Sequence, residues 1–495
     1  MKQTTAPLIE SLLAHADALP GRPAIVTAEE TVAYGEFARR ILSAAARIAR
    51  VIGGRGERVV LCGPNSSHLA AAYFAVHAAG GVAVLLDADA PADAVRAAAE
   101  DSEARLLLLA GTRGAGVSPA SAAGTAAPQV EDLADVSRLD ESRPLASPRA
   151  NLAEPADLLY TTGTTGRRKG VLLTHENIAQ AAVNINAFVG TLADDREAMP
   201  LPLAHSFGLG RLRVMALAGH CLLLMPGMRN PALFLKQVLD ARATGLALVP
   251  AGFDLILRMT RERLGDARGH LRYVEIGSAA MPPGTRAKLV ELLPATRICH
   301  HYGLTEASRA AFLEYHADRA HESAIGRPSP NVEMAVRDDQ GHDLPDGQQG
   351  QLVVRGRMVM QQYWKQPELT REVVRDGWLH TGDRGWRDAE GYYHLTGRQS
   401  DVVNVAGRKV DPEEVEQALN AHPAVVESAC IGAADPQGIA GECLKAFVVL
   451  RSDVRDEQLI DWLRQRLEEY KVPRIWQRVE RIAKTPSGKI QRHLM

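Results

Sequence analysis

The stretch ERVVLCGPNSSHLAAAYFAVHAAGGVAVLLD, residues 57–87, holds two short apolar runs separated by an alanine-rich segment with a helical pattern. Apolar runs of this length are typical of buried strands. A third run, LLLLAG (106–111), follows after another helix-like segment. Strands that alternate with helices indicate a sheet covered by helices on both faces. We therefore expect an α/β fold built on doubly wound sheets.

The same alternation continues after residue 157. Strands are expected near CLLLMP (221–226), LALVP (246–250) and LRYVEIG (271–277), each separated by a helical pattern. Between the two series, residues 111–130 are small and carry few apolar anchors, so this stretch is expected to be an exposed loop.

Beyond residue 330 the pattern changes to hairpin-like segments joined by polar turns, which predicts a smaller β-rich part of the large domain. An α+β stretch of domain size follows residue 401. We therefore expect a large N-terminal domain over 1–396, a hinge over 397–401 and a small mobile α+β domain over 402–495.

Composition excludes several classes of protein. The 495 residues contain 57 Lys plus Arg and 59 Asp plus Glu, a net charge of −2 that gives no general attraction to nucleic acid or to an anionic bilayer. No apolar run approaches the roughly 18 residues of a membrane span. The N-terminal stretch is charged and has helical periodicity, so an amphipathic helix is expected there instead of a secretion signal. The five cysteines form no Cys-x-x-Cys pair, which favours reduced, buried thiols in a cytoplasmic protein.

The segment LLYTTGTTGRRKGVLLTHENI (158–178) carries the most chemical information. A strand leads into a loop of glycine and threonine that ends in three cations, and a second strand follows. Glycines at 163, 166 and 170 free the backbone to place N–H groups around an anion, and the threonine hydroxyls add donors. The loop is not a P-loop. Arg168 stands where that motif requires a glycine, and Gly170 stands where it requires a serine or threonine. From composition alone, a phosphate-binding loop and a flexible basic turn are both possible.

The exact string resembles the phosphate-loop motif of the adenylate-forming superfamily, which includes acyl-CoA synthetases, peptide-synthetase adenylation domains and firefly luciferase. Four further segments resemble that superfamily's motifs in the same order. They are HYGLTEAS (301–308), WLHTGD (378–383), GYYHLTGRQSD (391–401) and KTPSGKIQR (484–492). The pattern is closest to stand-alone acyl-CoA or aryl-CoA ligases.

The resemblance implies a two-step reaction. A carboxylate attacks the α-phosphate of ATP, pyrophosphate leaves, and the acyl-adenylate then passes its acyl group to a thiol. Negative charge accumulates in the first step, so cations, oriented N–H groups and Mg²⁺ are required around the phosphates.

The resemblance also assigns residues of this sequence to roles. The β- and γ-phosphate loop comprises Thr161, Thr162, Gly163, Thr164, Thr165, Gly166 and Lys169. Tyr302 is expected against adenine, Thr305 at the α-phosphate, and Glu306 with Thr161 at the metal ion. Asp383 is expected to accept both ribose hydroxyls, Arg398 to contact ribose and phosphate, and Lys489 to bridge the carboxylate and the α-phosphate. Each residue alone also has an ordinary structural interpretation.

The segment LPLAHSFGLG (201–210) aligns with the part of the superfamily that opens the acyl pocket. Enzymes for α-amino acids carry an aspartate there, whereas this chain has His205 to Gly208, so the acid is expected to lack an α-amino group. His205 is either a gate near the carboxylate or a packed histidine. Pocket walls are expected at 249–253 and 277–281, with Ser278, Ala279 and Ala280 also expected to contact the ligand.

The thiol acceptor is expected in trans, on CoA or on the phosphopantetheine of a separate acyl-carrier protein. Gly407 matches a glycine that the pantetheine arm passes in acyl-CoA synthetases, and Lys409 adds a nearby cation. A fatty acid and an aryl acid are both possible substrates, and the protein is expected as a monomer or homodimer. A non-catalytic acyl- or nucleotide-binding relative is the alternative from another class.

Two positions depart from the superfamily's pattern. Arg168 replaces the proline that usually precedes the loop lysine, and Ser400 replaces the Asp or Lys expected at the hinge. Because the small domain rotates between the two steps in such enzymes, Ser400 is expected to influence the second step, and Asp401 is not expected to substitute for it.

Overall fold

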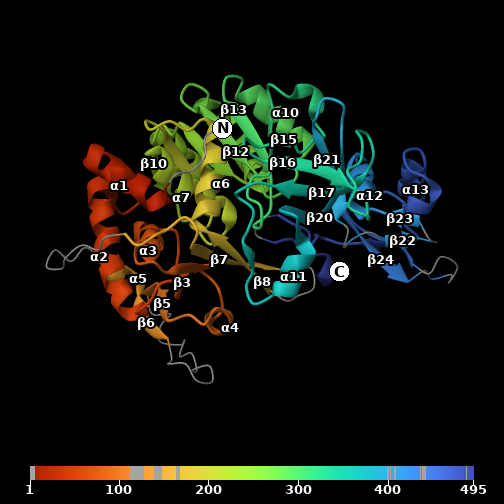
Figure 1. The fold of residues 1–495 in the computed structure, drawn as a ribbon. Coiled ribbons are helices and arrows are strands. Elements are labelled where there is room, and N and C mark those ends of the chain that lie inside the picture. Colours follow the sequence, from red (N-terminus) through yellow and green to blue (C-terminus); the bar gives the residue numbers. More distant parts are fainter. Residues whose placement is uncertain are drawn as a thin grey trace. The chain divides into compact units, whose positions relative to one another are not determined.

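A computed structural model describes residues 6–111, 128–138, 148–162, 168–398, 401, 403–405, 408–434, 436, 442–485 and 488–495. The chain divides into two compact units. The larger comprises Met1–Glu322, Pro328–Glu333 and Val354–Leu379, and the smaller comprises Ser323–Arg327, Met334–Val353 and His380–Met495. Figure 1 follows both along the chain. The predicted boundaries at 396 and 402 stay a prediction.

The first sheet of the larger unit has seven strands in the order β18-β8-β7-β4-β3-β5-β6. Its strands are β3 (Arg58–Cys62), β4 (Val82–Leu86), β5 (Leu106–Leu109), β6 (Gln129–Asp132), β7 (Pro155–Thr162), β8 (Arg168–Thr174) and β18 (Gln362–Tyr363). Strands β6, β5, β3, β4 and β7 are parallel, whereas β8 is antiparallel to both β7 and β18. The two apolar runs of residues 57–87 are thus neighbouring parallel strands, as predicted.

The second sheet of the larger unit has nine strands in the order β15-β14-β13-β12-β11-β9-β10-β1-β2. Its strands are β1 (Pro23–Val26), β2 (Thr31–Ala33), β9 (Arg196–Met199), β10 (Cys221–Leu224), β11 (Gly245–Leu248), β12 (Tyr273–Ile276), β13 (Arg297–Tyr302), β14 (Ala311–Glu314) and β15 (Arg327–Pro328). The central strands β10, β9, β11, β12 and β13 are parallel. Their carboxyl ends therefore lie at one edge, where α/β sheets usually bind ligands.

Eleven α-helices occur among the described residues of the larger unit. They are α1 (Leu8–Ala18), α2 (Tyr34–Ile52), α3 (Ser67–Ala78), α4 (Ala92–Ser102), α5 (Leu133–Ser137), α6 (His175–Val189), α7 (Ser206–Ala218), α8 (Pro231–Asp240), α9 (Pro250–Thr260), α10 (Pro283–Leu292) and α11 (Pro367–Val373). Helix α6 shows why such a helix starts and ends where it does. Thr174 and Asn177 form a capping box at its start, and Gly190 closes it in the left-handed region at φ 76°.

The smaller unit contains most of the β-rich part and an α+β part, whereas β19 and the end residues of β16, β17 and β20 are assigned to the larger unit. A five-stranded sheet has the order β16-β17-β20-β19, and β21 pairs with β20. These strands are β16 (Glu333–Arg337), β17 (Gly350–Arg355), β19 (Val374–Arg375), β20 (Trp378–Arg387) and β21 (Tyr393–Arg398). The α+β part has strands β22 (Val403–Val405), β23 (Arg408–Val410), β24 (Val425–Ala434), β25 (Glu442–Leu450) and β26 (Ile475–Arg478), with helices α12 (Pro412–Asn420) and α13 (Asp456–Arg464).

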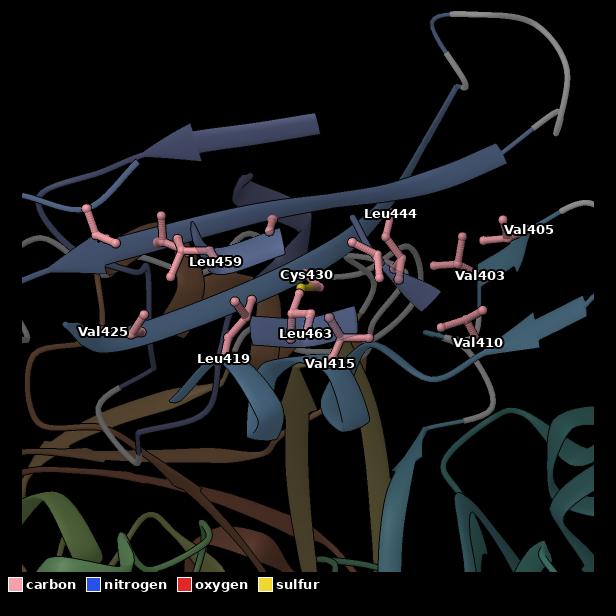
Figure 2. Close-up of a cluster of buried hydrophobic side chains, with 14 of the residues drawn as sticks. Val403, Val405, Val410, Val415, Leu419, Val425, Cys430, Leu444, Leu459 and Leu463 are labelled. Carbon is pink, nitrogen blue, oxygen red and sulfur yellow. The ribbon is translucent and has the colours of Figure 1, made fainter. Parts of the chain in front are cut away.

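The α+β part has a hydrophobic core of its own. Side chains of β22, β24, β25, α12 and α13 meet there, including Val403, Leu419, Cys430, Leu444 and Leu463 (Figure 2). A segment that buries its own apolar side chains can fold as a unit, which supports the proposal of a small C-terminal domain.

One sequence expectation is wrong in detail. The stretch 111–130 was expected to be a loop throughout, but Gln129 and Val130 begin β6 and pair in parallel with β5. Strand β6 is the edge strand of the sheet and is held by backbone hydrogen bonds to β5. Such pairing does not require apolar side chains. Residues 112–127 lie outside the described part of the chain.

The cysteines agree with their prediction: Cys62, Cys221, Cys299, Cys430 and Cys443 are all free and buried. Among the described residues, no helix is long and apolar enough to span a bilayer.

Candidate active site

Strands β7 and β8 bring the two ends of the predicted phosphate loop together. Thr161 is paired with Lys169, and the Thr161 hydroxyl donates to the Lys169 carbonyl at 3.4 Å. Gly163, Thr164, Thr165 and Gly166 lie outside the described residues, as does the side chain of Thr162. The described part of the motif is therefore a strand pair that leads into and out of the loop.

Lys169 and Glu306 are linked through Tyr363, which the sequence did not indicate. The Lys169 ammonium lies 5.5 Å from the centre of the Tyr363 ring. The Tyr363 hydroxyl donates to Glu306 Oε1 at 2.7 Å. Tyr363 belongs to β18, which pairs with β8 opposite Val171, so the sheet itself places this ring between the two motifs. The predicted phosphate cation and the predicted metal ligand thus share one partner.

Gly170 has a different role from the one that its motif suggested. It lies in β8 opposite Tyr160, and its backbone shows no left-handed conformation. A Cβ at this position would lie 2.9 Å from the Leu158 side chain and 3.1 Å from Cβ of Trp364. Gly170 is thus a closely packed strand residue, so the prediction that it lends flexibility to an anion loop is wrong.

The predicted adenine and metal motif, HYGLTEAS (301–308), begins in the last two residues of β13, His301 and Tyr302. The loop after it is fixed by reciprocal backbone bonds between Leu304 and Ala307 at 3.1 and 3.2 Å. The Met360 N–H donates to the Glu306 carbonyl at 2.8 Å. Thr305, between them, is half-buried. The backbone that presents Thr305 and Glu306 is thus anchored on both sides.

The donor set fits a magnesium ion that is held jointly with phosphates. No group of three or more His, Cys, Asp or Glu side chains suited to a metal occurs in the described part of the chain. Mg²⁺ is commonly held by one or two carboxylates plus substrate phosphates and waters. The Tyr363 bond engages Oε1 of Glu306, so Oε2 can serve as the protein ligand. The side chain of Thr161, the other predicted ligand, is half-buried at the end of β7.

The predicted acyl-pocket walls follow adjacent parallel strands. Residues 249–253 come directly after β11 and residues 277–281 directly after β12, and both strands are in register with their neighbours. Ser278 has a left-handed backbone at φ 75°, a conformation that non-glycine residues adopt at a cost. His300 bonds through Nε2 to the Ala279 carbonyl at 3.0 Å. Ala280 is exposed.

His205 immediately precedes α7 and is paired with Asp87. The distance from His205 Nε2 to Asp87 Oδ1 is 3.2 Å, and both side chains are a little over 40% exposed. The hydrogen bond to Asp87 raises the pKa of His205 above its ordinary value. Asp87 follows β4, so its place after a buried parallel strand was the signal that could have identified it. The pairing favours the charged imidazolium.

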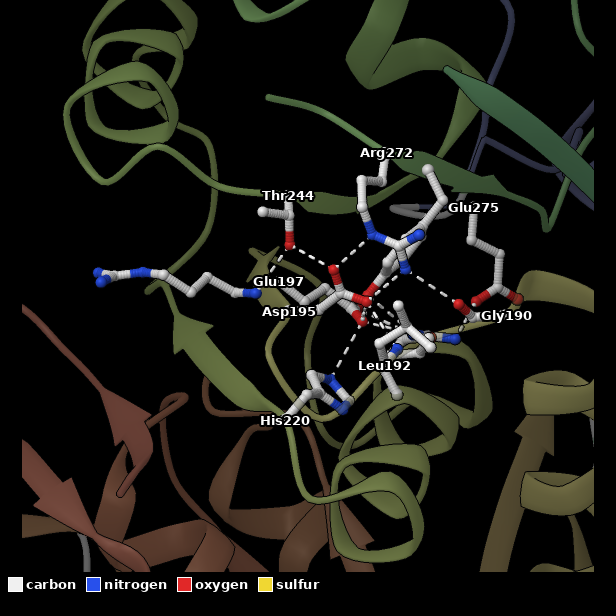
Figure 3. Close-up of polar contacts among 12 residues, drawn as sticks. Gly190, Leu192, Asp195, Glu197, His220, Thr244, Arg272 and Glu275 are labelled. Carbon is white, nitrogen blue, oxygen red and sulfur yellow. Dashed lines mark hydrogen bonds and ion pairs between the residues drawn. The ribbon is translucent and has the colours of Figure 1, made fainter. Parts of the chain in front are cut away.

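A buried ion cluster lies among β9, β12 and α7, and no motif predicted it. Arg211 donates to Glu197 at 2.7 Å and to Glu275 at 3.0 Å, and Arg309 donates to Glu275 at 3.0 Å. His301, next to Tyr302, lies with Nδ1 2.9 Å from Glu275. Figure 3 shows Glu197, Glu275 and His220 among these polar contacts. The cluster holds two guanidinium groups and two carboxylates, so its charges balance.

The smaller unit carries Asp383 and Arg398 on paired strands. Asp383 lies opposite Arg398 in the β20–β21 register, and Arg398 Nε is 2.9 Å from Asp383 Oδ1. Asp383 is 3% exposed, whereas the Arg398 side chain is 38% exposed. The buried acid and its cation form a polar pair at the end of β21, whose last residues overlap the start of the predicted hinge.

Lys489 is presented by a tight turn of the smaller unit. Its N–H donates to the Thr485 hydroxyl at 3.1 Å, and the Thr485 N–H donates to its carbonyl at 2.8 Å. The Lys489 side chain is exposed. Asp401 lies 3.4 Å from Arg492, which also holds Glu416. The Asp401 carboxylate is thus used to hold the segment that carries Lys489. Ser400, Gly407 and the Lys409 side chain lie outside the described residues.

Comparison with known families identifies two matches. Residues 12–364 match a family described as AMP-binding enzyme, and residues 414–489 match the AMP-binding enzyme C-terminal domain. The feruloyl-CoA synthase of an Amycolatopsis species is 34% identical over 470 residues, which are 92% of each chain.

Solved structures give the same result. ATP-bound MatB from Rhodopseudomonas palustris superposes with a TM-score of 0.89 at 29% identity, covering 99% of this chain and 98% of that one. The o-succinylbenzoate coenzyme A synthetase MenE from Bacillus subtilis, in complex with ATP and magnesium ion, has a TM-score of 0.86 at 25% identity over 99% of both chains.

Proposed function

Because this chain belongs to the AMP-binding enzyme family, we propose that it is an AMP-forming ligase that joins a carboxylic acid to the thiol of CoA. The predicted superfamily, the α/β fold with a large and a small domain, and the acid–thiol ligase class are confirmed by these relatives. ATP, Mg²⁺ and CoA are accordingly its co-substrates and metal.

The link from Lys169 through Tyr363 to Glu306 is the observation that carries the assignment of the residues. It joins a cation suited to the β- and γ-phosphates with a carboxylate suited to Mg²⁺ through Tyr363, whose strand β18 pairs with the Lys169 strand β8. Phosphoryl chemistry relies on positioning and charge stabilisation more than on covalent help from the protein, and this arrangement supplies both.

The reaction has two balanced steps. An oxygen of the acid's carboxylate bonds to the α-phosphorus of ATP while the bond from that phosphorus to the pyrophosphate oxygen breaks. The sulfur of the CoA thiolate then bonds to the acyl carbon, and AMP leaves with the electron pair of the broken C–O bond. Bound Mg²⁺ supplies neutralisation of the phosphate charge, and Glu306 with Thr161 are its proposed protein ligands.

The remaining assignments follow from the resemblance and from the chemistry of each side chain. Lys169 balances the charge of the departing pyrophosphate and Thr305 donates to the α-phosphate. Tyr302 stacks on adenine, and Ser278, Ala279 and Ala280 pass close to the ligand. Asp383 accepts from the ribose hydroxyls, Arg398 supports it, and Lys489 attracts both the carboxylate and the α-phosphate. His205 contributes a cation at the acyl segment, and Gly407 and Lys409 serve the pantetheine arm.

The substrate is a carboxylic acid without an α-amino group, and aryl acids are the first to test. The support is the identity of 34% with a feruloyl-CoA synthase over almost the whole chain, and the lack of an aspartate in residues 201–210 that could pair with an ammonium group. CoA is the proposed acceptor and a carrier protein the alternative. A cytoplasmic monomer or homodimer is proposed, consistent with the five free, buried thiols.

Acid-dependent exchange between ATP and labelled pyrophosphate tests the proposal. The panel comprises hydroxycinnamic, benzoic, medium- and long-chain fatty, dicarboxylic and amino acids. Exchange with an aryl or fatty acid, followed by thioester formation when CoA is added, is the expected result. Absence of exchange with every acid would contradict the ligase assignment. Thioester formation with a phosphopantetheinylated carrier protein, and none with CoA, would contradict the choice of acceptor.

Lys489→Ala is expected to lower exchange by at least 100-fold, because the positive charge that holds two anions together is lost. Lys484→Ala is the matched control, since Lys484 lies on the same segment but pairs with Glu427. Exchange by this control is expected within threefold of wild type. Equal losses in both variants would show that the segment, and not the Lys489 ammonium, is responsible.

A further inference from the structure

Arg309 is not among the residues to which a role in the reaction was assigned, and it has two energetically unfavourable features. Its backbone is left-handed at φ 54°, and its guanidinium is buried, with the side chain 2% exposed. A non-glycine residue in this conformation and an arginine removed from water are each unfavourable unless the surroundings compensate. Burial accordingly lowers the pKa of Arg309 in spite of its carboxylate partner. The surroundings therefore hold this side chain in one specific place.

The guanidinium donates to two other segments of the larger unit. Nε donates to Glu275 at 3.0 Å, on strand β12. Nη1 and Nη2 donate to the carbonyls of Ser206 and Phe207, each at 3.0 Å, in the first turn of α7. Arg309 itself belongs to the loop of the adenine and metal motif, three residues after Glu306. One side chain thus joins the acyl segment, the metal loop and β12.

Two glycines make room for this arrangement. A Cβ at Gly210 would lie 2.3 Å from Nη1 of Arg309, and a Cβ at Gly303 would lie 2.4 Å from the Arg309 backbone nitrogen. Phe207 packs against the same guanidinium, whose central carbon lies 5.0 Å from the centre of the Phe207 ring. The rings of Phe207 and His301 form a T-shaped pair with their centres 4.6 Å apart. The acyl segment and the adenine motif are consequently packed on one guanidinium.

Resting on the proposed function, we propose that Arg309 is a positioning residue that aligns the acyl segment with the metal and α-phosphate loop for adenylation. Each segment binds its own substrate, so loss of alignment leaves binding largely intact but moves the carboxylate away from the α-phosphorus. Displacement by about 1 Å can cost about 100-fold in rate for a reaction that depends on alignment. Thioester formation starts from an acyl-adenylate whose two parts are already joined, so it depends less on this alignment.

The test compares Arg309→Lys with Arg213→Lys. The control residue lies on helix α7, whose first turn Arg309 contacts; it is equally buried at 2% exposure but pairs with Asp157 and Tyr73. The Arg309 variant keeps the positive charge but cannot make three divergent bonds. Its kcat for acid-dependent pyrophosphate exchange is expected to fall about 100-fold. ATP affinity and thioester formation from supplied acyl-adenylate are expected within fivefold of wild type.

A purely structural role predicts that both half-reactions of Arg309→Lys fall by the same factor, that its unfolding midpoint falls as well, and that Arg213→Lys behaves in the same way. That result would overturn the proposal. Unchanged exchange in a folded Arg309→Lys protein would overturn it as well. If wild-type protein shows no exchange with any acid, the proposed function fails instead, which separates the two outcomes.

Gly210→Ala provides an independent variant that leaves every charge in place. The added methyl group pushes on the guanidinium, so the same selective loss in adenylation is expected, at about tenfold. Gly284→Ala is the matched control, because no atom lies within 4 Å of a Cβ at that position. Equal adenylation rates in the folded Gly210→Ala protein and its control would contradict the positioning role.

Discussion

The two units each contain a buried ion cluster, and the clusters differ in their balance of charge. In the larger unit, Arg211 and Arg309 face Glu197 and Glu275. Burial raises the pKa of Glu197, but Arg211 more than offsets it, and the pKa falls to about 2. The partners, more than the burial, decide the charge of this carboxylate.

In the smaller unit, Arg492 faces Glu416 and Asp401, with Asp411 and Glu413 close by. Burial raises the pKa of Glu416 to about 7, because one guanidinium does not compensate for several desolvated carboxylates. Burial likewise raises the pKa of Asp411 to about 7. Buried Glu197 is thus ionised at pH 7, whereas Glu416 and Asp411 are about half protonated there.

The largest effect is expected from breaking the balanced cluster. Glu275→Gln leaves Arg309 and Arg211 with one carboxylate between them, and removal of one partner of a buried ion pair costs about 3 to 5 kcal/mol. The measurement is the free energy of opening of β12 amides, from hydrogen exchange in increasing urea. A loss below about 1 kcal/mol would show that the cluster is solvated in solution.

The second prediction is that the two units respond to pH in opposite directions. The pKa of Glu416 and of Asp411 is raised on folding, so the folded smaller unit binds more protons than the unfolded chain. Their contribution to stability is therefore complete below their ordinary pKa values and is lost as the pH rises through about 7. For Glu416, whose pKa rises from 4.5 to about 7, this is on the order of 3 kcal/mol.

For Glu197 the sign is reversed. Its contribution is complete above its ordinary pKa of 4.5 and is lost as the pH falls toward about 2. Between pH 5 and 7.5, amides of β24 and β25 are expected to lose protection while those of β9 and β12 do not, after correction for the intrinsic exchange rates. Glu416→Gln is the control that flattens the response of β24. A flat response in the unaltered protein would contradict the raised pKa values.

A smaller effect is expected at the half-exposed pair of His205 and Asp87, where one cation meets one anion near water. Asp87→Asn removes the main cause of the raised His205 pKa, so this pKa is expected to fall toward the ordinary 6.5. Titration of the His205 ring protons by NMR measures it. A pKa that stays high in Asp87→Asn would assign the effect to Asp89, the other nearby carboxylate.

The smallest effect is expected at an ion pair on the surface of the larger unit. Arg355 and Glu333 are 44% and 62% exposed, so water solvates both charges without the pair. Glu333→Gln is expected to leave the opening free energy of β12 within experimental error. If Glu333→Gln lowered the opening free energy as much as Glu275→Gln, burial could not explain why the two ion pairs differ in their effect on stability.

The strands of the larger unit were predictable because parallel strands buried on both faces are nearly continuous apolar runs. β3, β4, β5, β10 and β12 lie within the stretches expected, and β11 begins one residue before its stretch, at Gly245. Strand β6 was missed because an edge strand is held by backbone bonds and leaves no apolar pattern. Backbone pairing of this kind depends on a neighbour distant in sequence.

The motifs could be located in the sequence because each is local, whereas the side-chain partners of their residues could not; the roles given to the motif residues stay predictions. Tyr363 reaches Glu306 from 57 residues away, and Arg309 reaches Ser206 from 103 residues away. Gly170 was interpreted as a loop residue because its role depends on Trp364, also distant in sequence. Side-chain partners across a fold leave no periodic pattern for the sequence to reveal.

The burial of all five cysteines has a chemical consequence for an enzyme that makes acyl-adenylates. Such mixed anhydrides acylate any accessible thiolate, so an exposed cysteine would compete with CoA for the product. Burial raises the pKa of Cys221 to about 11 and that of Cys299 to about 12, which keeps both protonated at neutral pH. The protein is in this respect inert toward its own intermediate, and consumption of the CoA thiol can be followed with a thiol reagent while the native enzyme contributes little background.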